Sequence, residues 1–361
     1  MSQALSDHPV SLVAEGRSCA ISTVTDGLPA RLRALTAPRR GLILLDQAFR
    51  AEAETWAREL PGFQVIFPTR PGEEAKTLDE ARLILTALAE AGLSRDDWLI
   101  VRGGGSLTDL GALAAGLYQR GLRLILVPTT LLGAVDAAVG GKTAVNFNGA
   151  KNQVGHFYLP QNVLVDLKSL ATLPRERLAE GLVEAYKTGL LFDPALAALA
   201  EDQAGPILEG DLRLTAEVAR RSYAAKAALV ARDFREEKGL RDVLNLGHTF
   251  GHLAESFYAP SLSHGRAVAL GLRVAAEMSV ARYGLSPVTA GRMAETARRL
   301  GGPAPPLPDQ AAALNLLRAD KKIRAGCLRF VFLEAPGRPL VADSSPEELL
   351  AAARRCWPAE N

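Results

Sequence analysis

Three of the five histidines in this chain lie within seventeen residues, in the stretch NLGHTFGHLAESFYAPSLSHG (245–265). If the stretch begins as a helix, His248 and His252 lie four residues apart on one helix face, and His264 follows after a turn. This spacing suits two metal ligands, or one ligand and one acid–base group. The HExxH pattern of zinc proteases is absent. The alternative is a cluster of hydrogen-bonded histidines in the core.

Glu184 is the carboxylate best suited to complete a metal site with these histidines. It lies inside the apolar segment GLVEAYKTGLL (181–191), with Lys187 one helical turn later. A carboxylate in such a place is costly unless it is paired or bound to a metal. A solvated Glu184–Lys187 pair is the alternative. Three histidines together with a half-buried carboxylate favour a metal site.

The segment VPTTLLGAVDAAVGGKTAVNFNGAKN (127–152) indicates an anion-binding site, and we expect it to be a long loop after a strand. Gly-Gly-Lys allows the ammonium of Lys142 to approach a phosphate, because no bulky side chain blocks it. A lone Gly-Lys is usually only a turn, but Lys151 and Asn152 follow within eleven residues. Further cations are solvated charges if taken singly, but together they suit a multiply anionic substrate: Lys226, Arg241, Lys321 and Lys322.

Glycines also follow the predicted strand WLIVR, in the segment GGGSLTD (103–109). Consecutive glycines let the backbone approach a phosphate, and a helix that starts there offers free N–H groups. The GxGxxG pattern is absent, so a plain tight turn is the alternative. Asp46 ends the strand GLILLD, where a carboxylate can accept ribose hydroxyls, and the turn PGEEAK adds Glu73 and Lys76. Each of these charges, taken singly, is more often a solvated surface group.

Charge and cysteine usage exclude several classes of protein. The 361 residues contain 42 Lys+Arg and 40 Asp+Glu, so no basic excess argues for nucleic acid or a membrane surface. The three cysteines are far apart and form no CxxC, which suits a reducing cytoplasm. We find no secretory signal and no apolar stretch of about 18 residues. A cytoplasmic protein that binds neither nucleic acid nor membrane is expected.

The coarse pattern predicts two domains. Residues 1–174 alternate short apolar strands with amphipathic helices, which is typical of a Rossmann-like α/β domain with a parallel sheet. Residues 175–361 are expected to form a mostly α-helical domain. The predicted strands are 41–46, 98–102, 122–128, 162–166 and 327–337, and the predicted helices are 77–92, 107–119, 174–191, 211–232, 248–258, 266–283 and 290–300.

Taken in order, these stretches resemble the 3-dehydroquinate synthases of the sugar phosphate cyclase superfamily. The similarity runs from about residue 40 to residue 337. An ordered set of pieces is far more specific than any one piece. The pieces are GGGSLTDLGALAAGLYQRG, PTTLLGAVDAAVGGKTAVN, GAKNQVGHFY, GLVEAYK, GLRDVLNLGHTFGH, HGRAVA and DKK.

The resemblance implies a Zn²⁺ site, for which Co²⁺ is also suited, with Glu184, His248 and His264 as ligands. It places His252 beside the substrate rather than on the metal. The implied catalytic residues are Asp136, Lys142, Lys187, Lys226, Arg241, Asn245 and His252. The implied substrate-binding residues are Arg120, Lys151, Asn152 and Lys322, with Lys321 as a substitute for Lys322.

The resemblance also implies NAD in the domain formed by residues 1–174 and metal and substrate in the domain formed by residues 175–361. Arg120 would reach the site of a neighbouring subunit, which implies a homodimer. The implied cofactor-binding residues are Asp46, Glu73, Lys76, Gly104, Gly105, Asp109, Thr129, Thr130, Lys142, Lys151 and Thr172.

The implied reaction converts 3-deoxy-D-arabino-heptulosonate 7-phosphate to 3-dehydroquinate and phosphate, a step of the shikimate pathway to aromatic amino acids. It proceeds by transient NAD oxidation, phosphate elimination, re-reduction and an intramolecular aldol reaction. Another sugar phosphate cyclase, such as an aminodehydroquinate synthase, is one alternative. A metal-dependent NAD(P) alcohol or polyol dehydrogenase is another, although that family favours PTTAGTGSE where this chain has PTTLLGAVD. A non-catalytic relative is the third.

Three residues depart from the pattern of the family. His264-Gly265-Arg266 stands where the family usually has His-Gly-Glu. A cation at a helix start opposes the helix dipole, and a carboxylate near the metal is lost. We therefore predict that Arg266 has an acidic partner. Tyr186 and His156 stand where smaller or aliphatic residues are more common.

Overall fold

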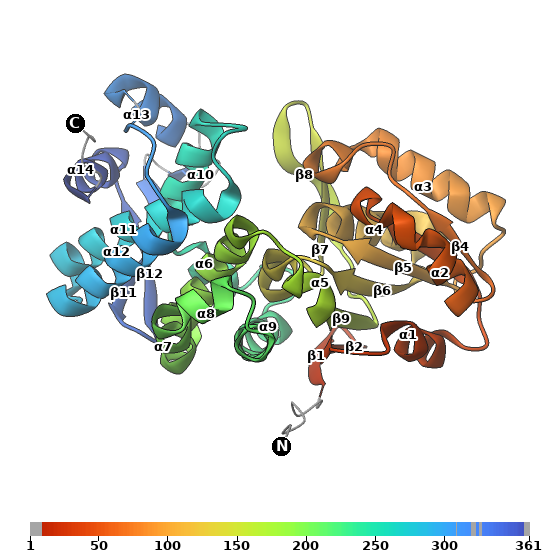
Figure 1. Cartoon of the computed structure of the whole chain (residues 1–361). Coiled ribbons are helices and arrows are strands. Elements are labelled where there is room, and N and C mark those ends of the chain that lie inside the picture. Colours follow the sequence, from red (N-terminus) through yellow and green to blue (C-terminus); the bar gives the residue numbers. More distant parts are fainter. Residues whose placement is uncertain (1–8, 308, 319–322, 325–326, 357–361) are drawn as a thin grey trace, which may run out of the picture. The chain divides into compact units, whose positions relative to one another are not determined.

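A computed structural model describes residues 9–307, 309–318, 323–324 and 327–356 (Figure 1). Within these residues the chain forms two compact units. The first unit runs as far as Pro174 and includes residues 210–237. The second comprises residues 175–209 and the described chain from Lys238 onward. The sequence analysis had assigned residues 210–237 to the domain formed by residues 175–361, whereas in the structure they belong to the first unit.

A seven-stranded sheet forms the centre of the first unit, in the order β1-β2-β9-β6-β5-β3-β4. β1 pairs with β2 in antiparallel fashion and the other neighbours are parallel, which confirms the expected fold class. Of these strands, β1, β2 and β4 had not been predicted. The strands are β1 (Val10–Ala14), β2 (Arg17–Val24), β3 (Gly41–Leu45), β4 (Phe63–Ile66), β5 (Trp98–Gly103), β6 (Arg123–Pro128) and β9 (Asn162–Asp166).

The central strands are buried along their whole length because helices cover the sheet. Every residue of β3 and β5 is buried, which explains their continuous apolar runs. Leu32 and Trp56 of the covering helices pack in one core cluster with Ile43 and Ile100 of the sheet. The helices of this unit are α1 (Leu28–Thr36), α2 (Ala53–Glu59), α3 (Leu78–Glu90), α4 (Gly105–Leu117), α5 (Leu167–Ala171) and α9 (Leu212–Arg232).

The segment expected to be a long loop contains regular structure, so that expectation was wrong. After β6, the short π-helix η4 (Gly133–Ala137) is followed by the antiparallel hairpin of β7 (Lys142–Phe147) and β8 (Ala150–Phe157). Asn148 and Gly149 form the two-residue turn with φ of 49° and 73°. Asn-Gly is the strongest short hairpin signal, because both residues tolerate positive φ.

The second unit is mostly helical, as predicted. It also holds a small antiparallel sheet in the order β10-β11-β12. No helix among the described residues is both long and apolar enough to cross a membrane. The elements are α6 (Arg175–Phe192), α7 (Pro194–Asp202), α8 (Ala204–Leu208), η5 (Leu240–Asn245), α10 (His248–Phe257), α11 (His264–Tyr283), α12 (Pro287–Gly301), α13 (Gln310–Arg318), β10 (Ile323–Arg324), β11 (Cys327–Ala335), β12 (Arg338–Ser344) and α14 (Pro346–Cys356).

Candidate functional site

Three helices of the second unit bring Glu184, His248 and His264 together. Glu184 lies inside α6, whereas His248 and His264 are the first residues of α10 and α11. One donor atom of each residue lies within 4.8 Å of the others. The Nε2 atoms of His248 and His264 are 3.6 Å and 3.3 Å from the Glu184 Oε1 atom. One carboxylate and two imidazoles at these distances form a suitable set of ligands for Zn²⁺ or a similar divalent ion.

Hydrogen bonds on the far side of each imidazole aim Nε2 toward Glu184. His248 Nδ1 is 3.2 Å from the Leu246 carbonyl oxygen, which can only accept, so Nδ1 carries the proton and Nε2 is free to bind a metal. His264 Nδ1 is likewise 3.2 Å from the Glu255 carboxylate. Carbonyl and carboxylate partners of this kind usually accompany histidines that bind metals.

Glu184 itself fits a metal. The residue is 1% exposed, and neither carboxylate oxygen accepts a hydrogen bond of good geometry from the residues that the structure describes. Its charge is balanced in this structure by the Lys187 ammonium, 2.5 Å from Oε2. Burial raises the pKa of Glu184, but Lys187 and the two histidines outweigh this and hold it well below its usual value. The carboxylate is therefore ionised and ready to bind a cation.

The pKa values of His248 and His264 are shifted in opposite directions. Burial, and then the nearby Lys187 cation, hold the pKa of His248 well below its usual value. Burial also disfavours the cation of His264, but the carboxylates of Glu184 and Glu255 raise its pKa to about 10. His252 lies on α10 with its ring centroid 5.3 Å from that of His248 and 6.3 Å from that of His264. The three histidine rings thus lie close together, and His248 and His264 flank the buried carboxylate.

The predicted acidic partner of Arg266 is absent from the described residues, so that prediction was wrong. Arg266 Nε donates to the Gly301 carbonyl at 3.0 Å, and its terminal nitrogen donates to the Pro303 carbonyl at 2.9 Å. Gly301 is the last residue of α12. A helix C-terminus carries partial negative charge and unpaired carbonyls, so it can replace a carboxylate as the partner of an arginine.

In the first unit, several of the predicted cofactor residues lie at a topological switch point of the sheet. From β3 the chain moves to one side to form β4 and to the other side to form β5. Ligands of such sheets bind outside the carboxyl ends of the strands where the order reverses. Asp46 follows β3, and its backbone N–H donates to the Arg102 carbonyl of β5 at 2.9 Å. Gly104 and Gly105 follow β5 and open α4.

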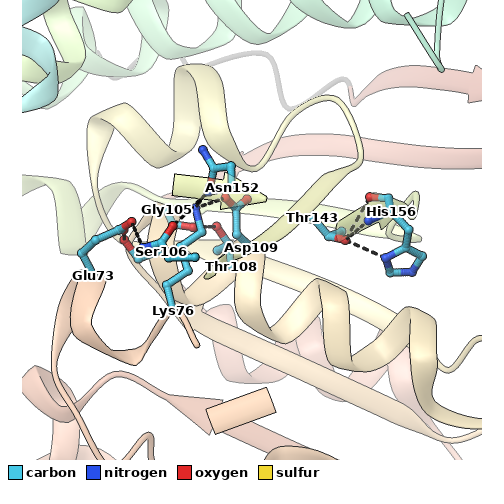
Figure 2. Close-up of polar contacts among 10 residues, drawn as sticks. Glu73, Lys76, Gly105, Ser106, Thr108, Asp109, Thr143, Asn152 and His156 are labelled. Atoms are coloured by element: carbon cyan, nitrogen blue, oxygen red, sulfur yellow. Dashed lines mark hydrogen bonds and ion pairs between the residues drawn. The ribbon is translucent and has the colours of Figure 1, made fainter. Parts of the chain in front are cut away.

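Figure 2 shows a network around Lys76 beside the start of α4. Lys76 is 5% exposed, and its ammonium donates to Asp109 Oδ2 at 2.7 Å and to Asn152 Oδ1 at 2.6 Å. Burial raises the pKa of Asp109 to about 6, although Lys76 opposes the shift. Glu73 accepts hydrogen bonds from Ser106 and, at 2.8 Å, from Asn146. The network joins the short helix η2 (Gly72–Ala75), α4 and the β7–β8 hairpin.

Three threonines are also among the predicted cofactor residues, and they lie near the same edge of the sheet or bond within their own turn. Thr129 and Thr130 follow β6, where the Thr129 N–H donates to the Gly103 carbonyl at 3.0 Å. Thr130 Oγ1 accepts from the Gly133 N–H at 3.0 Å. Thr172 caps the end of α5, and its hydroxyl donates to the Ser169 carbonyl. Thr129 and Thr130 therefore belong to the switch-point edge.

Further predicted substrate residues of the first unit lie on α9 and the hairpin. The Lys226 ammonium of α9 donates to Asp136 Oδ1 at 2.6 Å, and also to the Asp136 carbonyl. Lys142 forms an ion pair with Glu236, and its side chain remains 56% exposed. Lys151 is exposed on β8. Arg120 lies in the short helix η3 (Tyr118–Arg120) with a φ of 63°.

Comparison with known protein families supports the family resemblance that the sequence shows. Residues 66–180 match the family model of the N-terminal part of 3-dehydroquinate synthase, and residues 181–323 match the model of its C-terminal part. The chain belongs to the 3-dehydroquinate synthase family. The 3-dehydroquinate synthase of Paenarthrobacter aurescens is 37% identical over 91% of both chains. That of Saccharopolyspora erythraea is 41% identical over 78% of this chain and 76% of its own.

Solved structures of sugar phosphate cyclases share the fold of this synthase-family chain. A 2-epi-5-epi-valiolone synthase from Streptomyces hygroscopicus with bound NAD⁺ and Zn²⁺ is 28% identical, with a TM-score of 0.83 over 93% of this chain and 96% of its own. A 2-deoxy-scyllo-inosose synthase bound to carbaglucose-6-phosphate, NAD⁺ and Co²⁺ is 22% identical, with a TM-score of 0.85 over 96% and 99%. An iron-containing alcohol dehydrogenase from Thermococcus thioreducens has a TM-score of 0.65 at 17% identity over 96% and 98%.

The other predicted site residues of this member of the 3-dehydroquinate synthase family lie in the second unit. Arg241 and Asn245 belong to η5, and Arg241 is 3% exposed. Lys187 is 2% exposed beside Glu184. Lys321 and Lys322 lie outside the described residues.

Glu255 is one residue that the sequence analysis missed. His248, His252 and Glu255 follow one another at i, i+4 and i+7, so they share one face of α10. That spacing could have indicated a second carboxylate beside the histidines. Ser106 and Asn146, which donate to Glu73, were also missed.

Proposed function

We propose that this protein is a 3-dehydroquinate synthase that converts 3-deoxy-D-arabino-heptulosonate 7-phosphate to 3-dehydroquinate and phosphate. This carbon–oxygen lyase reaction belongs to the shikimate pathway of aromatic amino-acid biosynthesis. Membership of the family over residues 66–323 supports the proposal. The observation that carries it is the buried cluster of Glu184, His248 and His264 beside Lys187, which offers a metal site and a cation together.

In this proposal Glu184, His248 and His264 hold Zn²⁺ or Co²⁺. When bound, the metal polarises an oxygen of the substrate, and NAD accepts and later returns a hydride. Lys187 then supplies positive charge where enolate-like charge develops, in a place from which water is excluded. His252, Arg241 and Asn245 bind and orient the substrate, and His252 is suited to move a proton.

The first unit takes NAD at the switch-point edge in this proposal. Asp46 accepts ribose hydroxyls, while Gly104 and Gly105 allow the dinucleotide phosphates to approach the α4 N-terminus. Glu73, Lys76, Asp109, Thr129, Thr130 and Thr172 complete the cofactor contacts, whereas Asp136, Lys142, Lys151, Asn152, Lys226, Lys322 and Arg120 serve the anionic substrate. Arg120 acts on the site of a partner subunit in a cytoplasmic homodimer.

A different sugar phosphate cyclase is the second candidate. The structural similarity to a 2-epi-5-epi-valiolone synthase at 28% identity favours it. The two candidates differ in substrate and share the cofactors, so assays with other sugar phosphates separate them. A dehydrogenase of alcohols or polyols has the same fold but has less use for the cations around Asp136 and Glu184.

Phosphate release from the heptulosonate phosphate, with catalytic amounts of NAD and Zn²⁺, tests the proposal. Phosphate should be released without accumulation of NADH, because the hydride is returned. Glu184→Gln removes a metal ligand and should abolish release, whereas Glu295→Gln, on the surface of α12, should have no effect. NADH that accumulates with simple alcohols would instead show a dehydrogenase. Metal-loaded protein that gives neither signal would point to another sugar phosphate or to a non-catalytic relative.

A further inference from the structure

His156 lies in β8 and packs against Gly116 in α4 of the same unit. If Gly116 carried a Cβ atom, that atom would collide with His156 Nε2 and approach Cε1 to 2.5 Å. The histidine ring thus fills the space that a side chain at position 116 would occupy. Both residues belong to the first unit, whereas Glu184, His248 and His264 belong to the second.

Thr143 holds the ring in this position, as Figure 2 shows. Thr143 is directly opposite His156 in the β7–β8 pairing. Its hydroxyl donates to the His156 carbonyl at 2.9 Å and lies 2.8 Å from Nδ1. A hydroxyl has one proton, so Nδ1 is the donor to Oγ1 and Nε2 is left as an unprotonated acceptor. Nε2 is buried and has no hydrogen-bond partner among the described residues, so its contact with Gly116 is one of packing alone.

A second contact joins the same strand to the same face of α4. Asn152 of β8 accepts from Lys76, which also donates to Asp109 of α4. Asp109 and Gly116 are seven residues apart, so they lie two turns apart on one face of the helix. Two contacts therefore hold the hairpin on α4. One is the set of hydrogen bonds through Lys76, and the other is the packing of the His156 imidazole on Gly116.

We propose that His156 is a positioning residue, whose imidazole packs on Gly116 and bonds to Thr143 and thereby fixes the β7–β8 hairpin so that Lys151 and Asn152 are placed for an anionic cofactor or substrate. This inference rests on the proposed function for the identity of that ligand. The fit between a large side chain at position 156 and glycine at position 116 does not depend on the proposed function.

Hydrogen exchange and NAD binding of His156→Ala, Gly116→Ala and the double variant test the proposal. In His156→Ala, exchange across residues 142–157 should accelerate about tenfold or more, while β5 stays protected. The dissociation constant of NAD should rise about tenfold, because a small displacement of binding groups is costly. Gly116→Ala should show the same changes, since its methyl group expels the ring.

The double variant should lie closer to the wild type than the sum of the single changes, because the alanine methyl group takes the place of the ring. Leu83→Ala truncates an exposed residue of α3 in the same unit and should change neither readout. Strictly additive effects, or wild-type exchange in His156→Ala, would overturn the proposal. Loss of protection in β5 as well would show general destabilisation and overturn it too. None of these readouts needs turnover, so a failure of the proposed reaction is recognised separately by absent phosphate release in the wild type.

Discussion

The Glu255 carboxylate lies 3.2 Å from His264 Nδ1, on the side of the ring opposite Glu184. His264 therefore lies between two carboxylates, one buried in α6 and one on α10. Arg266 stands where the family usually has a glutamate, but it bonds to the end of α12. Glu255 thus supplies the carboxylate that the sequence had suggested was lost.

Glu255→Gln is expected to weaken metal binding by about 10- to 100-fold, because the carboxylate fixes the proton on Nδ1 and makes Nε2 a better ligand. Competition with a chelator of known affinity measures the change. Glu277→Gln is the matched control, since Glu277 lies on α11 but pairs with Arg355. Equal metal affinity in the wild type and Glu255→Gln would show that Glu255 does not support the metal site.

The metal-free protein should lose stability as the pH rises from about 6.5 to about 10. The pKa of His264 is raised from its usual 6.5 to about 10. Over this window the folded protein keeps a proton that the unfolded chain has released. The stabilisation is complete below pH 6.5 and lost as the pH passes 10.

Urea unfolding at several pH values, with His264→Asn for comparison, measures this contribution. The difference in unfolding free energy between the wild type and His264→Asn should shrink as the pH rises. Glu255→Gln should give a smaller pH dependence than the wild type, because one of the two carboxylates that raise the pKa is neutral. A difference that stays constant from pH 6 to pH 10 would contradict the prediction.

How much of the fold could be predicted from the sequence depended on how far apart in the chain the interacting residues lie. Continuous apolar runs predicted β3, β5, β6 and β9, because a parallel sheet covered on both faces buries every residue. The antiparallel edge β1–β2 was missed, since its half-exposed residues carry a weak signal. The β7–β8 hairpin had a local Asn-Gly signal that small and polar residues around it obscured.

The same distinction separates the residues of the candidate site that were predicted from those that were not. Spacing along one helix indicated His248 and His252, and burial of a charge in an apolar helix indicated Glu184. The partners of Arg266 could not be predicted, because they are backbone carbonyls 35 and 37 residues away that any sequence would offer. The packing of His156 on Gly116 likewise joins residues 40 positions apart and depends on the pairing of β7 with β8.

Lys226→Met should lower kcat/KM for phosphate release by about 100-fold or more, since it removes a buried cation that the proposed chemistry needs. Methionine retains most of the aliphatic stem, so the fold should be kept. Asp136 holds the Lys226 ammonium at 2.6 Å, and Asp136→Asn should have a smaller effect because the amide oxygen still accepts. Lys168→Met, at an exposed pair with Asp26, is the control and should leave activity unchanged. Full activity of Lys226→Met would exclude this role.

Arg266→Ala should destabilise the metal-free protein by about 1–2 kcal/mol, because two charge-assisted hydrogen bonds to the end of α12 are lost. Arg266→Glu should destabilise it more, since a carboxylate would face the same carbonyls and the negative end of the helix dipole. Metal affinity of Arg266→Ala should stay within about threefold of the wild type, as Glu255 and Leu246, not Arg266, bond to the ligand histidines. Chemical unfolding and chelator competition on the same preparations distinguish the two effects. Weaker metal binding without a change in stability would instead place Arg266 among the supports of the metal site.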